Sequence, residues 1–172
     1  MGTLSAAEAT GFFPLVQLPA FNYSLVDKDS FGNISKIYFI NGGCLAYFDY
    51  NSYRQIGNAH ANFIKTVSCD ASFASVNGSL KFNGNKTLIY YHSATRVFKY
   101  DMYSKTVTLL AGNGPSAYLD GLPTSSYFNG ITDVVFLRNL DTTYDEKCML
   151  VAESGNADIR IVPLAGPGFN CK

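Results

Sequence analysis

The sequence predicts an all-β protein made of a repeated antiparallel unit, and three observations lead to this fold class. The 172 residues include 13 Phe, 12 Tyr and 15 Gly, which favours strands and tight turns over helices. Apolar and polar residues alternate in short runs such as residues 96–100, and no stretch keeps helical periodicity for three turns. Finally, Phe31, Phe73 and Phe128 open three similar repeats, about 42 and 55 residues apart.

Composition and charge narrow the class of protein. Hydrophobic residues make up 47% and charged residues 15%, which excludes disorder, and the length suffices for a domain with a real core. The formal net charge of zero disfavours nucleic acid and anionic membranes as partners. No apolar run approaches the ~20 residues of a membrane span.

The N-terminal stretch differs from the rest of the chain. Residues 1–21 are expected to form a tail and an edge strand, and the repeats are expected to occupy residues 22–172. The first ten residues are small or polar and predict a loose end. Residues 12–21 are strand-like, but Pro14 and Pro19 cannot donate to a central ladder, so this strand belongs at a sheet edge.

Each repeat is expected to contain four strands, separated by turn residues such as Asn-Gly and Ser-Gly. In the first repeat they are residues 36–40, 45–49, 53–56 and 63–67. In the second repeat they are residues 80–82, 88–92, 96–100 and 106–110. In the third repeat they are residues 133–137, 149–153, 158–162 and a weak fourth strand in the tail after Val162.

The third repeat carries the most distinctive pattern. Within residues 106–164, an apolar strand leads to an Asp-Gly turn at Asp120, to Phe-Asn-Gly from Phe128, and to strands that contain Glu153 and Arg160. This stretch resembles one NHL repeat, the unit of a family of β-propellers. The resemblance implies an all-β propeller of the NHL type with about three four-stranded antiparallel blades, although the first two repeats keep only the period.

The resemblance also implies a structural role for one acid and one arginine in each blade. In NHL blades an acid usually closes the second strand and an arginine sits in the third. The acid accepts turn amides or pairs with the arginine. The residues that partly fill these places are Asp49 and Arg54, Arg96, and Glu153 and Arg160, while His92 replaces the acid of the middle repeat.

Three blades leave open sheet edges that would invite pairing with another chain. The expected architecture is therefore a partial propeller or half of an assembled one. The chain either dimerises into six blades, belongs to a longer chain, or forms an open stack of sheets.

Few residues suggest catalysis, and no catalytic or metal-binding residue is predicted. His60 and His92 are the only histidines and lack metal-ligand spacing. No nucleophile elbow or phosphate-binding glycine pattern follows a strand. An enzyme is therefore the less favoured interpretation, and no cofactor is expected.

The longest loop is the predicted binding loop. Its candidate residues are Asp141, Tyr144, Asp145 and Glu146, and insertions on one propeller face are where binding tends to occur. A loose calcium site is an alternative here, although the spacing does not match an EF-hand.

The four cysteines leave three possible connectivities open. Cys69 follows Cys44 by 25 positions and Cys171 follows Cys148 by 23, and this matched spacing favours bridges 44–69 and 148–171. Simple up-and-down strand order opposes these bridges, because it places the partners on opposite faces of a blade. Free buried thiols are a further alternative.

Four N-glycosylation sequons begin at Asn22, Asn33, Asn77 and Asn85. Together with the even number of cysteines they favour a secreted or cell-surface glycoprotein, with a cytoplasmic protein as the alternative. The N-terminus lacks the pattern of a signal peptide, so secretion would require that a leader was removed or sits in a longer precursor.

The predicted function is a protein- or glycan-binding module whose loops on one propeller face form the interaction surface. The alternatives are a propeller hydrolase or lyase that uses a metal at the central channel, and an RNA-binding NHL domain. Neutral charge argues against RNA. Phe31, Phe73 and Phe128 are each expected to pack between blades.

Overall fold

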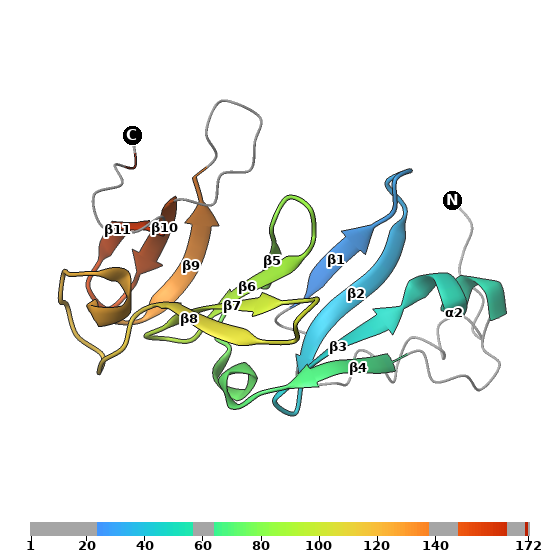
Figure 1. Cartoon of the computed structure of the whole chain (residues 1–172), viewed down its shortest axis with the longest axis horizontal. Helices are drawn as coiled ribbons and strands as arrows, with labels where there is room; N and C mark the ends of the chain where they lie inside the picture. The colour runs from blue at the N-terminus through green and yellow to red at the C-terminus, as the bar shows by residue number, and fades with distance from the viewer. Residues whose placement is uncertain (1–23, 57–63, 138–147, 165–170, 172) are drawn as a thin grey trace. The chain divides into compact units, whose positions relative to one another are not determined.

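A computed structural model describes residues 24–56, 64–137, 148–164 and 171 (Figure 1). The chain divides into two compact parts, Met1–Ala74 and Ser75–Lys172, which are called the N-terminal and C-terminal parts below. The described residues form three antiparallel sheets, so the prediction of an all-β fold is confirmed. No helix among these residues is long and apolar enough to cross a membrane.

The N-terminal part contains a four-stranded sheet of order β1-β2-β3-β4. Its strands are β1 (Leu25–Lys28), β2 (Ile34–Asn41), β3 (Cys44–Asp49) and β4 (Ile64–Cys69). A short helix, α2 (Tyr50–Ile56), lies between β3 and β4, and the 3-10 helix η2 (Ala71–Ser75) follows β4.

The prediction of a third strand at residues 53–56 of the first repeat is wrong, because these residues belong to α2. Asp49 ends β3 and its Oδ1 accepts the Ser52 amide at 3.0 Å, which caps the first turn of the helix. Tyr53 then packs against Phe48, with ring centroids 5.6 Å apart. The sheet still has four strands because β1, a strand that was not predicted from the sequence, pairs with β2.

The prediction that Phe31 packs between blades is also wrong, because its side chain is 88% exposed. Phe31 lies in the β1–β2 turn, where Asp29 Oδ1 accepts the amides of Phe31 and Asn33, both at 2.9 Å. Phe73 and Phe128, in contrast, are 1% and 0% exposed.

The C-terminal part holds two sheets, of orders β5-β6-β7-β8 and β11-β10-β9. The strands of the second sheet are β5 (Lys81–Phe82), β6 (Leu88–His92), β7 (Val97–Asp101) and β8 (Val107–Ala111). Those of the third are β9 (Ile131–Phe136), β10 (Cys148–Glu153) and β11 (Asp158–Pro163), and the 3-10 helix η3 (Pro123–Ser125) precedes β9. The weak fourth strand expected after Val162 falls mostly outside the described residues.

One hydrophobic cluster joins the second and third sheets. Tyr90 and Phe136 also meet there with ring centroids 4.1 Å apart, and Lys81 Nζ pairs with Asp133 Oδ1 at 2.6 Å. The two sheets of the C-terminal part therefore pack as neighbours. The buried members of the cluster are Val97, Ala111, Phe128, Ile131, Val134, Met149, Val151 and Val162.

Two Asn-Gly pairs hold comparable places in these sheets. The Asn77 amide donates to the His92 carbonyl at 2.9 Å, and the Asn129 amide donates to Glu153 Oε2 at 2.7 Å. In each case the acceptor is the last residue of the second strand. This places Val76, rather than Phe73, in the position of Phe128.

Candidate functional site

The centre of β11 is held by the guanidinium of Arg160, whose side chain is 9% exposed. Its Nη1 donates to the Tyr127 carbonyl at 2.6 Å and to Glu153 Oε1 at 3.3 Å. Its Nη2 donates to the Leu119 carbonyl at 2.8 Å and to Asp120 Oδ1 at 2.9 Å. Arg160 thus fixes the segment between β8 and β9 onto the third sheet.

Two aromatic rings complete the surroundings of Arg160. The guanidinium carbon lies 4.9 Å from the centroid of the Tyr118 ring and 4.7 Å from that of Phe128. Both contacts have the geometry of cation–π interactions. Tyr118 is about half exposed, so one side of this arrangement reaches the surface.

Glu153 plays the structural role expected of the acid that ends the second strand. Its side chain is fully buried, and Oε2 accepts the Asn129 amide and Asn156 Nδ2, both at 2.7 Å. The remaining oxygen accepts from Arg160. Because every charge is paired and hydrogen-bonded, the burial of this ion pair is tolerated.

Beside Arg160 lies a recess of ≈ 270 Å³ along the open edge of the third sheet. β11 forms one wall, with Asp158–Pro163 in succession, and the other wall includes Tyr118, Asp120, Pro123 and Ser126. Among the described strands, only β10 pairs with β11 (Figure 1). The recess therefore occupies the side of β11 where a further strand would lie.

The backbone groups of β11 alternate between β10 and the recess. The backbone N–H of Ile159 donates to Oδ1 of the preceding residue, Asp158, at 2.7 Å. This N–H therefore points away from β10. By alternation, the Ile161 amide points the same way, and Pro163 at the next such position has no N–H. At this edge the Ile159 N–H already has an acceptor, and Pro163 has no N–H to donate. The Ile161 N–H, which lies between them, can donate to a further strand.

The outward side chains near this edge are apolar. Ile159 and Ile161 are 66% and 55% exposed, and Leu150 pairs with Ile161 on one side and with Val135 on the other. Val135 is itself 48% exposed. Three β-branched side chains therefore lie on one exposed face of a sheet whose other face is buried.

The charges around the recess are unbalanced. Arg160 is the cation, and Glu153, Asp120 and Asp158 are carboxylates, which leaves an excess of two negative charges in this group. The Asp120 carboxylate is the main reason that the pKa of Tyr118 is raised. The open part of the recess therefore favours a positively charged group.

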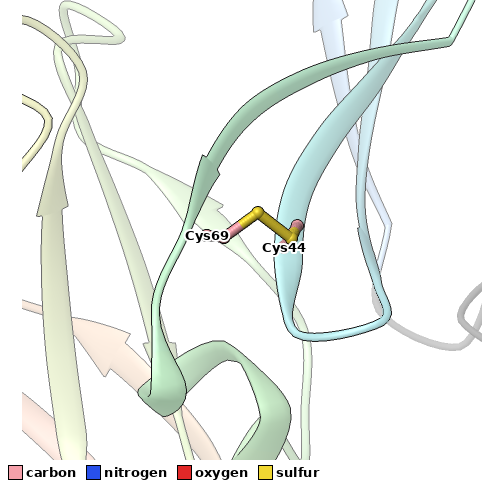
Figure 2. The surroundings of a disulfide bond; sticks show 2 residues. All are labelled: Cys44 and Cys69. Carbon is pink, nitrogen blue, oxygen red and sulfur yellow. A yellow bond between two sulfur atoms is a disulfide. The ribbon is translucent and has the colours of Figure 1, made fainter.

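The structure contains two disulfides, and they are the pair that the matched spacing favoured. Cys44 and Cys69 face each other in the β3–β4 ladder, with Cα atoms 4.0 Å apart (Figure 2). The objection from strand order fails because α2 replaces the expected third strand and β4 lies beside β3. Cys148 and Cys171 are bridged with Cα atoms 5.8 Å apart.

The other candidate residues divide into described and undescribed positions. Asn33, Asn77 and Asn85 are exposed. The binding-loop candidates Asp141, Tyr144, Asp145 and Glu146 lie outside the described residues, as do Asn22, His60 and the side chain of Arg54. Within the described ranges, no three His, Cys, Asp or Glu side chains gather in a way that could hold a metal ion.

His92 is the histidine that the structure describes, and it is fully buried at the end of β6. Its Nδ1 lies 3.1 Å from the Ser93 carbonyl oxygen, and no described residue contacts Nε2 by a hydrogen bond. Burial lowers the pKa of this imidazole despite the Ser93 carbonyl and the Asp133 carboxylate, which raise it. His92 therefore packs as a neutral side chain.

No family model matches the sequence, and no curated protein matches it. Solved structures do resemble the fold. An auxiliary nutrient binding protein from Bacteroides thetaiotaomicron matches 74% of this chain with a TM-score of 0.53 at 15% identity. The PQQ domain of a pyranose dehydrogenase from Coprinopsis cinerea matches 78% with a TM-score of 0.39 at 16% identity. A Trichoderma reesei enzyme of Carbohydrate-Active Enzymes Family AA12 matches 86% with a TM-score of 0.46 at 14% identity.

The chain spans about a third of the length of these structures, with 31%, 28% and 37% of their chains covered. At 15% identity, the first likeness concerns the fold alone, and it supports propeller-like sheets. The fold is thus all-β with antiparallel, propeller-like sheets.

Proposed function

We propose that the chain is an extracellular protein-binding module built on NHL-type propeller blades, and that it binds an extended protein segment along β11. The carrying observation is the recess on the open side of β11, next to exposed Ile159 and Ile161. Addition of a strand to a sheet edge is a recurrent mode of peptide recognition.

The chemistry of the recess defines the partner segment. Alternating apolar side chains would cover Ile159 and Ile161, and backbone groups would pair with those of Ile161. The excess negative charge near Asp120 and Asp158 favours a lysine or arginine at one end of the segment. A nutrient binding protein is among the structures with a similar fold, which agrees with a binding role for such sheets.

Two further features support the rest of the proposal. The Glu153–Arg160 pair matches the acid and arginine of an NHL blade. The two disulfides favour an oxidising compartment, and hence a secreted or cell-surface location.

The test is selection of binders from a displayed library of random octapeptides against the immobilised full chain. We expect enriched sequences with apolar residues at alternate positions and one terminal Lys or Arg. Ile161→Pro, which removes the central outward N–H, should weaken binding at least tenfold, and Asp158→Asn should reduce the preference for a basic residue.

Val135→Thr is the matched control, because it changes an exposed β-branched residue of the same sheet at the far edge strand, β9. It should leave peptide affinity within about twofold of the parent. Equal affinity of Ile161→Pro and the parent would overturn the β11 site. If the chain instead forms a concentration-dependent dimer that Ile161→Pro abolishes, the idea of a foreign partner would be overturned. The bound segment would then belong to a second copy of this chain.

A further inference from the structure

The turn between β5 and β6 places Asn85 at an exposed tip with its side-chain oxygen turned inward. Asn85 Oδ1 accepts from Thr87 Oγ1 at 2.7 Å, from Asn83 Nδ2 at 2.5 Å and from the Thr87 amide at 3.4 Å. Asn83 Oδ1 in turn accepts the Leu88 amide at 2.8 Å. These bonds close the turn within the six residues 83–88.

The side-chain nitrogen of Asn85 is left on the solvent side of this turn. The carbonyl and the nitrogen of a primary amide diverge from one carbon, so an inward Oδ1 directs Nδ2 outward. No described residue accepts a hydrogen bond from Asn85 Nδ2. Asn85 also begins the one sequon whose third residue is threonine, the other three having serine.

We propose that Asn85 is the preferred site of N-linked glycosylation in this chain. The donor is an oligosaccharide carried on a lipid pyrophosphate. A bond forms between Asn85 Nδ2 and C1 of the first sugar, the bond from C1 to the pyrophosphate oxygen breaks, and Nδ2 loses one proton. Oδ1 keeps its three hydrogen bonds, so the modified turn retains its structure.

The other described sequons lack this geometry. Asn33 Nδ2 donates to Asp29 Oδ2 at 3.3 Å, so its nitrogen is engaged. In the Asn77 sequon, Ser79 Oγ reaches Asp133 Oδ1 at 3.5 Å instead of the asparagine. Gly78 also lies against the His92 ring, where an added Cβ would stand 2.0 Å from Nε2. In neither sequon does the serine hydroxyl form a hydrogen bond with the side chain of the asparagine.

The test is site occupancy in the full chain, expressed behind a secretory leader in cultured insect cells. Peptide-N-glycosidase in heavy-oxygen water converts each glycosylated asparagine to a mass-labelled aspartate, which peptide mass spectrometry then counts. Asn85 should be occupied on most molecules and at least twofold more than Asn33 or Asn77. Equal or higher occupancy at either of those sites, or an unmodified Asn85 in secreted protein, would overturn the proposal.

Substitutions separate modification from folding. Asn85→Asp keeps an oxygen acceptor for Thr87 and should lose one glycan mass, with both disulfides still formed. Thr87→Val should give the same loss, whereas Ser35→Ala, the control in the Asn33 sequon, should leave Asn85 occupancy unchanged. An unchanged glycan mass in Asn85→Asp would contradict the assignment. None of these results depends on the β11 site.

Discussion

Truncation of Phe128 tests how the third sheet is built. Its side chain is 0% exposed, belongs to the cluster between the second and third sheets, and lies 4.7 Å from the Arg160 guanidinium. Phe128→Ala removes the contacts of the ring with the hydrophobic cluster and with the Arg160 guanidinium at once. Large-to-small changes of a buried phenylalanine cost about 3–5 kcal/mol, which includes the residual cavity. The free energy of unfolding should therefore fall by about that amount.

Two exposed aromatic residues provide the controls. Phe31, which the repeat pattern aligned with Phe128, is 88% exposed, and Tyr103 in the C-terminal part is 95% exposed. Phe31→Ala and Tyr103→Ala should each change the free energy of unfolding by less than about 0.5 kcal/mol. Urea titrations with intact disulfides, followed by tyrosine fluorescence and circular dichroism, measure all three variants.

A loss of less than about 1 kcal/mol in Phe128→Ala would contradict the packing of this ring in a buried cluster. An equal loss in Phe31→Ala and Phe128→Ala would contradict the exposure of Phe31. That result would restore the equivalence of the two residues that the repeat pattern predicted.

Arg160→Met should cost about 3–5 kcal/mol because it leaves Glu153 buried without its cation, and adding Glu153→Gln should recover part of that loss in a double-mutant cycle of urea titrations. Burial lowers the pKa of His92 in the folded state below its usual 6.5. The free energy of unfolding should therefore decline as the pH falls through the unfolded-state pKa, and it should level off below the folded-state pKa. Urea titrations at several pH values should show a smaller decline for His92→Gln. Gly78→Ala should cost about 1–3 kcal/mol by thermal melting, since the new Cβ would meet the His92 ring.

The strands of the second repeat could be predicted from the sequence because each one carries its own local signals. Residues 88–92 form an almost continuous buried run, and residues 97–101 include alternating positions. Turns that contain Asn-Gly or Ser lie at the ends of these strands. The helix α2 could not be predicted in this way. Its seven residues are too few for a helical period, and it depends on the Asp49 cap and on the packing of Tyr53.

The register of the repeats was harder to predict than their number. The phenylalanine pattern aligned Phe31 and Phe73 with Phe128, whereas the hydrogen bonds donated by the two backbone amides align Asn77 with Asn129. Asn77-Gly78 and Asn129-Gly130 are visible in the sequence, but so are Asn-Gly pairs at positions 41, 83 and 113, so the pairs alone do not select this alignment. The Arg160–Asp120 contact joins residues 40 positions apart, so local periodicity carries no signal for it.

The second disulfide fixes one end of β11, the edge strand along which we propose that a partner segment binds. Cys148 is paired with Pro163 in the β10–β11 ladder, and Cys171 is bonded to Cys148, so Cys171 is held at the Pro163 end of β11. Asp158 lies at the other end, about 17 Å away at a rise of about 3.4 Å per residue. On this proposal, the Asp158 carboxylate favours a partner segment whose basic residue lies at that end, away from the disulfide.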